Sequence, residues 1–206
     1  MGTPSSLSRT WLASLALLTF MLAGDSRLSL AMGQDSPSKQ SKTDSQLLEL
    51  DGLSFTVPKG WMRQPQDKRG PMSPKAVFTI PGIKAEDAAG TVRITHFPTM
   101  KGKNDLNIQR WLGQVTKADG RPSTRKDATI TKVDIGEVRL TIVDLSGSVR
   151  ITMRQTPKPD HRLIACILDH PREPHFVVVA GGKMQMKRWQ DEIHAFLRSA
   201  KVKSKG

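Results

Sequence analysis

The sequence of 206 residues contains a single cysteine, Cys166, and no tyrosine. One cysteine cannot form an internal disulfide, so the fold must be stabilised by burial of apolar surface, which a domain of about 150 residues can supply. The chain also has no Gly-x-Ser-x-Gly elbow, Walker phosphate loop, dinucleotide fingerprint or His-Glu-x-x-His helix. The sequence therefore predicts neither an enzyme nor a bound cofactor.

Long apolar runs are also scarce, and the one near the N-terminus, from Trp11 to Ala23, is short. A membrane-spanning helix needs about 20 apolar residues, whereas this run has about 13 before Asp25 interrupts it. Small residues at Ala31 and Gly33 suit cleavage just afterwards. We expect an export signal over residues 1–33 and a periplasmic or extracellular mature protein. The alternative is an uncleaved signal that tethers the domain to a membrane.

Acidic residues are few, with 19 Asp and Glu against 32 Lys and Arg, which gives a formal net charge of +13. A basic surface of this size favours anionic partners, and outside the cytoplasm these would be an acidic protein, an anionic wall polymer or a lipid headgroup. Membrane contact would be at most peripheral. The charges could also simply solvate the surface, because they are spread along the chain. Nucleic acid is not expected, since the aromatic residues fall on apolar faces.

Domain organisation follows from composition. Residues 34–46 are almost entirely polar and predict a disordered linker, residues 47–200 predict one domain, and residues 201–206 predict a frayed basic tail. Within the domain, period-2 alternation predicts strands. They are Leu53–Val57, Lys75–Ile80, Thr91–Phe97, Ala128–Asp134, Glu137–Leu145, Ser148–Arg154, Arg162–Asp169 and His175–Ala180.

Turn residues and helical spacing complete the expected fold. Ile135-Gly136, Ser146-Gly147 and Pro157 to Asp160 separate strands at hairpin distance and favour antiparallel neighbours. Apolar spacing predicts helices over 104–117, with Asn104 as the capping residue, and over 183–200. The sequence thus predicts a single α+β domain with a mainly antiparallel sheet of about 6–8 strands and two amphipathic helices packed on it.

Several sequence strings carry a family resemblance. They are Phe55-Thr56-Val57-Pro58-x-Gly60-Trp61, Ala76-Val77-Phe78-x-Ile80-Pro81, Asn107-x-x-Arg110-Trp111-x-x-Gln114 and Val143-Asp144-Leu145-Ser146-Gly147. With these, the chain resembles an uncharacterised family of exported bacterial proteins over residues 50–200. The order of elements in that family is similar to the α/β/α sandwich of the photosystem protein PsbP and of the Ran-binding Mog proteins. The resemblance implies a fold and a compartment, and no established activity.

Metal-ligating and catalytic candidates are weak. Cys166, His170 and His175 are suitable zinc ligands, but the stretch around Cys166 is apolar and the two histidines flank a turn, so we favour a buried core cysteine and no metal site. His96 alternates with Val92 and Ile94, which predicts a buried, hydrogen-bonded histidine rather than a general base. A pocket lined by His96 with a carboxylate within hydrogen-bond reach would favour an enzyme instead.

Arginines recur on the polar side of three predicted strands. Arg93, Arg139, Arg150 and Arg154 all alternate away from apolar residues, so they would share one sheet face if their strands were neighbours. Guanidinium groups arranged in this way could bind carboxylates or phosphates. The simpler alternative is an ordinary solvated face. The favoured hypothesis is a non-enzymatic exported binding module that docks an anionic partner, and the alternative is an exported hydrolase with a site assembled from distant residues.

Overall fold

A computed structural model of the chain describes residues 46–66, 70, 73–152, 155–171 and 173–203. The expected export signal, nearly all of the expected linker, and Arg154 lie outside these residues. Among the described helices, none is both long and apolar enough to cross a membrane.

The described chain forms eleven strands, three α-helices and two short 3-10 helices. In chain order they are β1 (Gln46–Leu50), β2 (Leu53–Val57), β3 (Met62–Arg63), β4 (Ala76–Ile80), β5 (Gly90–His96), η1 (Pro98–Met100), α1 (Asn104–Leu112), β6 (Val115–Thr116), η2 (Arg125–Asp127), β7 (Thr129–Ile135), β8 (Val138–Val149), β9 (Lys158–Asp169), β10 (His175–Gly182), α2 (Lys183–Arg188), α3 (Gln190–Arg198) and β11 (Lys201–Val202).

An eight-stranded sheet forms the centre of the domain, in the order β3-β4-β5-β10-β9-β8-β6, and β7 also pairs with β8. Every pair in it is antiparallel. A second, three-stranded sheet has the order β1-β2-β11. The predicted α+β class with a mainly antiparallel sheet is therefore confirmed.

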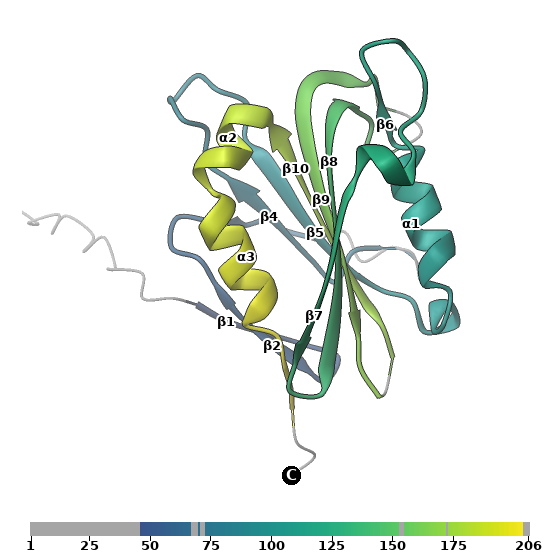
Figure 1. Ribbon diagram of the computed structural model, residues 1–206. Helices are drawn as coiled ribbons and strands as arrows, with labels where there is room; N and C mark the ends of the chain where they lie inside the picture. The colour runs from purple at the N-terminus through teal and green to yellow at the C-terminus, as the bar shows by residue number, and fades with distance from the viewer. Residues whose placement is uncertain (1–45, 67–69, 71–72, 153–154, 172, 204–206) are drawn as a thin grey trace, which may run out of the picture. The chain divides into compact units, whose positions relative to one another are not determined.

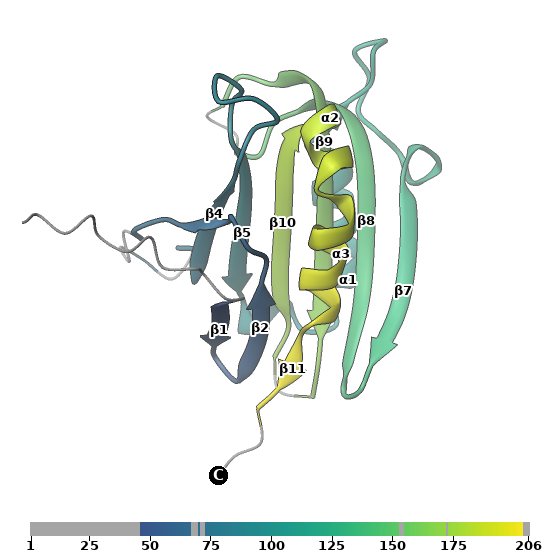
Figure 2. The ribbon, with the colours of Figure 1, turned by 90° about the vertical axis from the view of Figure 1, so that its left-hand side faces the viewer.

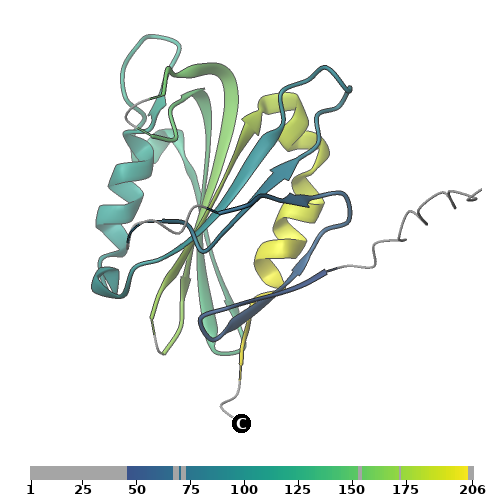
Figure 3. The ribbon, with the colours of Figure 1, turned by 180° about the vertical axis from the view of Figure 1, so that it is seen from behind.

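Helices cover both faces of the large sheet, with α1 on one side and α2 and α3 on the other (Figures 1 and 2). The same separation is visible from behind (Figure 3). Each side has its own core. Phe55, Phe78 and Phe196 are buried on the α3 side, and Trp111 and Phe176 are buried on the α1 side.

Strand alternation divides the residues between these two cores. On β5, Val92 and Ile94 are fully buried on the α3 side, whereas Arg93 and Thr95 face the α1 side. The sheet therefore presents one row of each strand to α1 and the alternate row to α3, and this arrangement decides where every candidate site residue lies.

Both helix predictions were too long. The first helix ends at Leu112, because Gly113 follows and Val115–Thr116 instead pair with β8 as β6. Its N-cap is Lys103, not Asn104, and no side chain caps it. The second predicted helix is divided at Trp189, whose dihedral angles of φ −95° and ψ 12° leave the helical region.

Three predicted boundaries were wrong near the strand ends. Ser146 and Gly147 make no turn, because β8 continues through them to Val149, and the predicted strand over 148–154 does not form, since Arg150 to Thr152 lie outside any strand. The predicted turn at Pro157 to Asp160 is largely the start of β9. Lys201 and Val202 are not frayed, because they pair with Ser54 and Leu53 of β2.

Candidate functional site

A small pocket lies between α1 and the sheet, and its charged lining residues are two arginines. Arg93 enters it from β5 and Arg110 from α1, and the pocket has a volume of about 190 Å³. The remaining lining residues are polar or apolar: Thr95, Phe97, Trp111, Gln114, Ile151, Thr152 and Val178. Since one water occupies about 30 Å³ in the liquid, the pocket has room for a single oxyanion such as a carboxylate or phosphate.

The two arginines of this pocket carry uncompensated positive charge. None of the ion pairs formed between described residues includes either side chain. The Arg110 guanidinium carbon lies 5.9 Å from the centre of the Trp111 ring, within the range of a cation–π contact. Partial burial lowers the pKa of Arg110. Arg110 as a whole is nevertheless exposed and Arg93 is half-buried, so an anion between them would attract both guanidinium groups while remaining partly screened by water.

Gln114 fixes the far wall of the pocket. Its backbone carbonyl accepts a hydrogen bond from the Arg150 amide at 2.9 Å, and its side-chain amide donates to the Ile151 carbonyl at 3.0 Å. The segment from Arg150 to Thr152 is therefore held against the C-terminal end of α1. Of the arginines proposed from the sequence, the structure brings Arg93 and the backbone of Arg150 to this one region.

Arg139 does not belong to this group. The sequence argument assumed that β5 and β8 are neighbours, but β10 and β9 lie between them. Arg139 is also neutralised, because its Nε donates to Asp134 Oδ1 at 2.7 Å. Arg154 lies outside the described residues. Arg93 and Arg139 both lie on the face opposite the α3-side core, as alternation predicted, but they are separated across the sheet, and the second arginine beside Arg93 is Arg110 from a helix.

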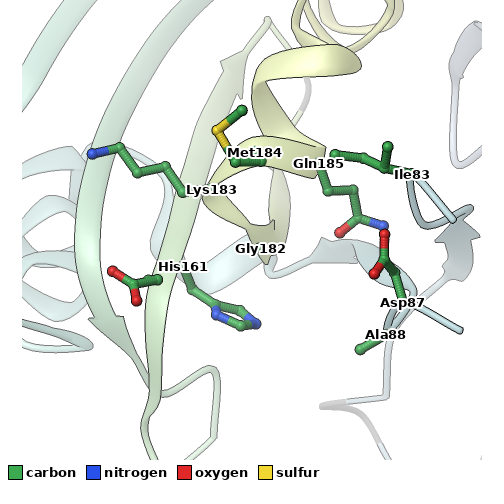
Figure 4. A pocket seen from close by; sticks show the side chains of 9 residues that line it. Ile83, Asp87, Ala88, His161, Gly182, Lys183, Met184 and Gln185 are labelled. Carbon is green, nitrogen blue, oxygen red and sulfur yellow. The ribbon is translucent and has the colours of Figure 1, made fainter.

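A larger pocket of about 480 Å³ lies where β10 runs into α2 (Figure 4). Figure 4 shows Lys183 and Gln185 pointing to opposite sides of the helix start, with Asp87 beside Gln185. The lining contains Asp87 and Asp160 as well as Lys183 and His161, so its charges are mixed. Mixed charge makes this pocket a poorer anion site than the one under α1, despite its size.

Three histidines lie close together near the start of β10, at the end of that strand away from α2. His96 and His175 are directly paired on β5 and β10, and their rings stack with centroids 4.5 Å apart. His96 Nε2 lies 2.6 Å from Glu173 Oε2, and its Nδ1 lies 3.6 Å from Asp51 Oδ2. His170 Nε2 lies 3.2 Å from His175 Nδ1. Burial lowers the pKa of His175 to about 4, helped by the neighbouring His96 and His170.

Cys166 lies apart from His175, and this separation agrees with the preference for a buried core cysteine over a Cys166–His170–His175 metal site. Cys166 is buried in the α3-side core opposite Val177, and Leu168, not Cys166, lies opposite His175. Burial raises the pKa of the Cys166 thiol, which makes it a poor thiolate ligand. His96 is more than half buried, as its alternation predicted, and two carboxylates that the sequence did not connect to it lie next to it.

Comparisons with known proteins show likeness of structure only. No family model and no curated protein matches the chain. The chain is similar to the solution structure of cyanobacterial PsbP (CyanoP) from Synechocystis, at 15% identity and a TM-score of 0.49, over 79% of this chain and 95% of that one.

Two further solved structures are similar in outline. One is a Pseudomonas aeruginosa protein described as of unknown function and a putative regulator, at 9% identity and a TM-score of 0.45, over 78% of this chain and 98% of that one. The other is a Bacteroides thetaiotaomicron protein, at 11% identity and a TM-score of 0.41, over 75% and 46%. The strand pairing and helix placement given above define the fold without them.

Proposed function

We propose that this protein is a non-enzymatic, exported binding module. It docks an anionic partner, one of whose oxyanion groups binds between Arg93 and Arg110. The observation that supports this most directly is the charge of the pocket under α1, which two unpaired arginines line without a described carboxylate. The Thr152 hydroxyl and the second N–H of the Gln114 amide are neutral donors that line the same space. Export over residues 1–33 is part of the proposal.

The chemistry of the pocket suits a carboxylate or a phosphate. Guanidinium groups donate two parallel hydrogen bonds to either oxyanion, and partial burial strengthens each of these bonds. An acidic protein would supply carboxylates, whereas an anionic wall polymer or a lipid headgroup would supply phosphates. The volume of about 190 Å³, equal to about six liquid waters, has room for such a group with some of its bound water, and affinity for a polymer would come from many weak, salt-sensitive encounters.

An exported hydrolase remains the second candidate, because Glu173 lies within hydrogen-bond reach of His96. A hydrolytic site also needs a nucleophile or an activated water. Among described residues, the ion pairs and the ring contact of His96 are with Asp51, Glu173 and His175, which carry no hydroxyl or thiol. The binding module therefore fits the arrangement better.

Charge reversal tests the proposal. The double variant Arg93→Glu/Arg110→Glu should lose salt-sensitive retention on immobilised polyglutamate, on polyphosphate or on phosphatidylglycerol vesicles, with affinity falling at least about tenfold. The three probes separate a carboxylate partner, a phosphate polymer and a lipid headgroup. Binding is measured at low and high ionic strength, and circular dichroism checks that the variant is folded.

A control of equal charge change is available on α2. Lys187 and Arg188 are exposed and lie on the other side of the sheet from Arg93. The variant Lys187→Glu/Arg188→Glu should keep its binding, apart from the modest loss that follows from lower net charge. Equal losses in the two double variants would show that net charge alone drives retention, and would refute the pocket. Unchanged binding of the Arg93→Glu/Arg110→Glu variant to all three probes would also refute the pocket.

A further inference from the structure

We propose that Asp51, His96 and His175 form a binding site for a divalent transition-metal ion of the zinc class. One potential ligand atom from each of the three residues lies within 4.8 Å of the other two. The residues come from separate segments: Asp51 from the β1–β2 turn, His96 from the end of β5 and His175 from the start of β10. The site is independent of the pocket under α1.

Each imidazole has one nitrogen close to a neighbour, which leaves the other for a metal. His96 Nε2 lies 2.6 Å from Glu173 Oε2 without the geometry of a hydrogen bond, and its Nδ1 lies 3.6 Å from Asp51 Oδ2. His175 Nδ1 contacts His170 at 3.2 Å. Ligating histidines in proteins are held by a hydrogen bond from the second ring nitrogen, and Glu173 and His170 are near enough to become such partners.

The second nitrogen of His175 supplies an independent indication. His175 is completely buried, and its Nε2 has no hydrogen-bond partner among the described residues. A buried polar atom without a partner costs free energy, so its retention needs a reason. The ring stacks on His96 at an interplanar angle of 12°, and one of its nitrogens lies within 4.8 Å of the ligand atoms of His96 and Asp51.

Asp51 is placed where it can close the site. It occupies a left-handed conformation, with φ +41°, in a two-residue turn with Gly52, and its side chain is 38% exposed. Ligand atoms around a tetrahedral zinc ion lie about 3.4 Å apart. The longest separations, up to 4.8 Å, must therefore shorten by up to about 1.4 Å, through rotation of the exposed Asp51 side chain together with the two histidine rings.

The donor set selects the class of ion. Two imidazole nitrogens and one carboxylate suit Zn²⁺, Co²⁺, Ni²⁺ or Fe²⁺, whereas Ca²⁺ and Mg²⁺ require oxygen ligands almost exclusively. Lys75 Nζ lies 3.1 Å from Asp51 Oδ2 and competes for that carboxylate. Removal of the lysine charge should therefore strengthen metal binding. A purely structural role for the cluster does not predict this result.

Calorimetric titration of the chelator-treated full chain with ZnCl₂ near neutral pH tests the site. We expect one ion per chain, and a Co²⁺ absorption spectrum typical of a tetrahedral site. Asp51→Asn should reduce the affinity at least about tenfold while preserving the turn, since asparagine tolerates positive φ. His96→Gln should have a similar effect, and Lys75→Gln should raise the affinity.

The surface histidine His161, which lines the pocket beside α2, provides the matched control. His161→Gln should leave zinc affinity unchanged. Absence of zinc binding to the folded, unmodified chain would overturn the proposal. Zinc binding that survives Asp51→Asn and His96→Gln would overturn it as well, because the ion would then lie elsewhere. Neither outcome bears on the Arg93/Arg110 pocket.

Discussion

Two aspartate–arginine pairs, each joining β8 to a neighbouring strand, differ in burial, and this difference should decide what each contributes to stability. Arg162 of β9 forms two hydrogen bonds to Asp144, with Nε–Oδ1 at 2.8 Å and Nη2–Oδ2 at 2.5 Å. Their side chains are only 16% and 21% exposed. The Arg162 Nη1 also donates to Gln190 Oε1 of α3 at 2.8 Å, so the pair joins the sheet to its covering helix.

Asp144→Asn should destabilise the domain by about 2–3 kcal/mol. Breaking one side of a fully buried pair costs about 3–5 kcal/mol, because the remaining charge stays buried without compensation. Residual exposure allows some solvent screening here, which reduces that cost. For a domain of this size, the loss corresponds to a fall in Tm of about 4–12 °C. The double variant Asp144→Leu/Arg162→Met removes both charges and should be less destabilised than the single variant.

Urea and thermal unfolding, followed by circular dichroism, measure both effects. The Asp134–Arg139 pair, which joins β7 to β8, is the control, since its side chains are 66% and 65% exposed. Asp134→Asn should leave the unfolding midpoint unchanged within error. The reasoning is refuted if Asp144→Asn changes stability no more than Asp134→Asn does, or if the double variant is the least stable of the set.

Two further predictions concern β8 and the turn before β7. Gly147→Ala should destabilise the domain by about 1–3 kcal/mol, because the added Cβ would lie 2.5 Å from the Thr116 carbonyl oxygen. Gly113→Ala is the control, since a Cβ there meets only ordinary van der Waals contacts. Urea unfolding of the two variants compares their stabilities. Hydrogen bonds from the Thr124 hydroxyl and amide lower the pKa of Asp127, so its stabilising effect is present at neutral pH and is lost as the pH falls through that lowered pKa. The stability difference between the unmodified chain and Asp127→Asn should therefore vanish in acid, and an equal difference at all pH values would contradict this.

Alternation predicted much of the sheet because the period of two reports burial directly. The apolar rows of β5, β8 and β10 coincide with buried positions. Ser146-Gly147 misled because this dipeptide is common in turns, while here Gly147 allows β6 to approach β8 closely. Trp189 falls on the same apolar face as the residues of α2 and α3, so the spacing of apolar residues over 183–200 does not indicate that the helix is interrupted there.

The candidate sites were less predictable, because they depend on which strands become neighbours. His96 and His175 each continue an apolar row, so both were recognisable as inward-facing, but their pairing requires the β5–β10 register. The pocket needs Arg110, which lies in the last turn of α1, four residues before Gln114 in the turn that follows the helix. That spacing was a usable signal, whereas the approach of Arg110 to Arg93 depends on how α1 docks on the sheet.

A mismatch of lengths explains why polar side chains survive on inward-facing rows. α1 has nine residues and is about 14 Å long, whereas β8 and β9 each have twelve residues and extend about 40 Å. One short helix cannot cover such strands, so positions beyond its footprint can keep arginine or threonine without forcing a charge into a dry core. On the other face, the histidine row ends beneath the Asp51 turn. The arginine pocket lies at the C-terminal end of α1, and the histidine cluster lies beside the Asp51 turn. At such edges of the two cores the chain can hold polar groups with little loss of stability.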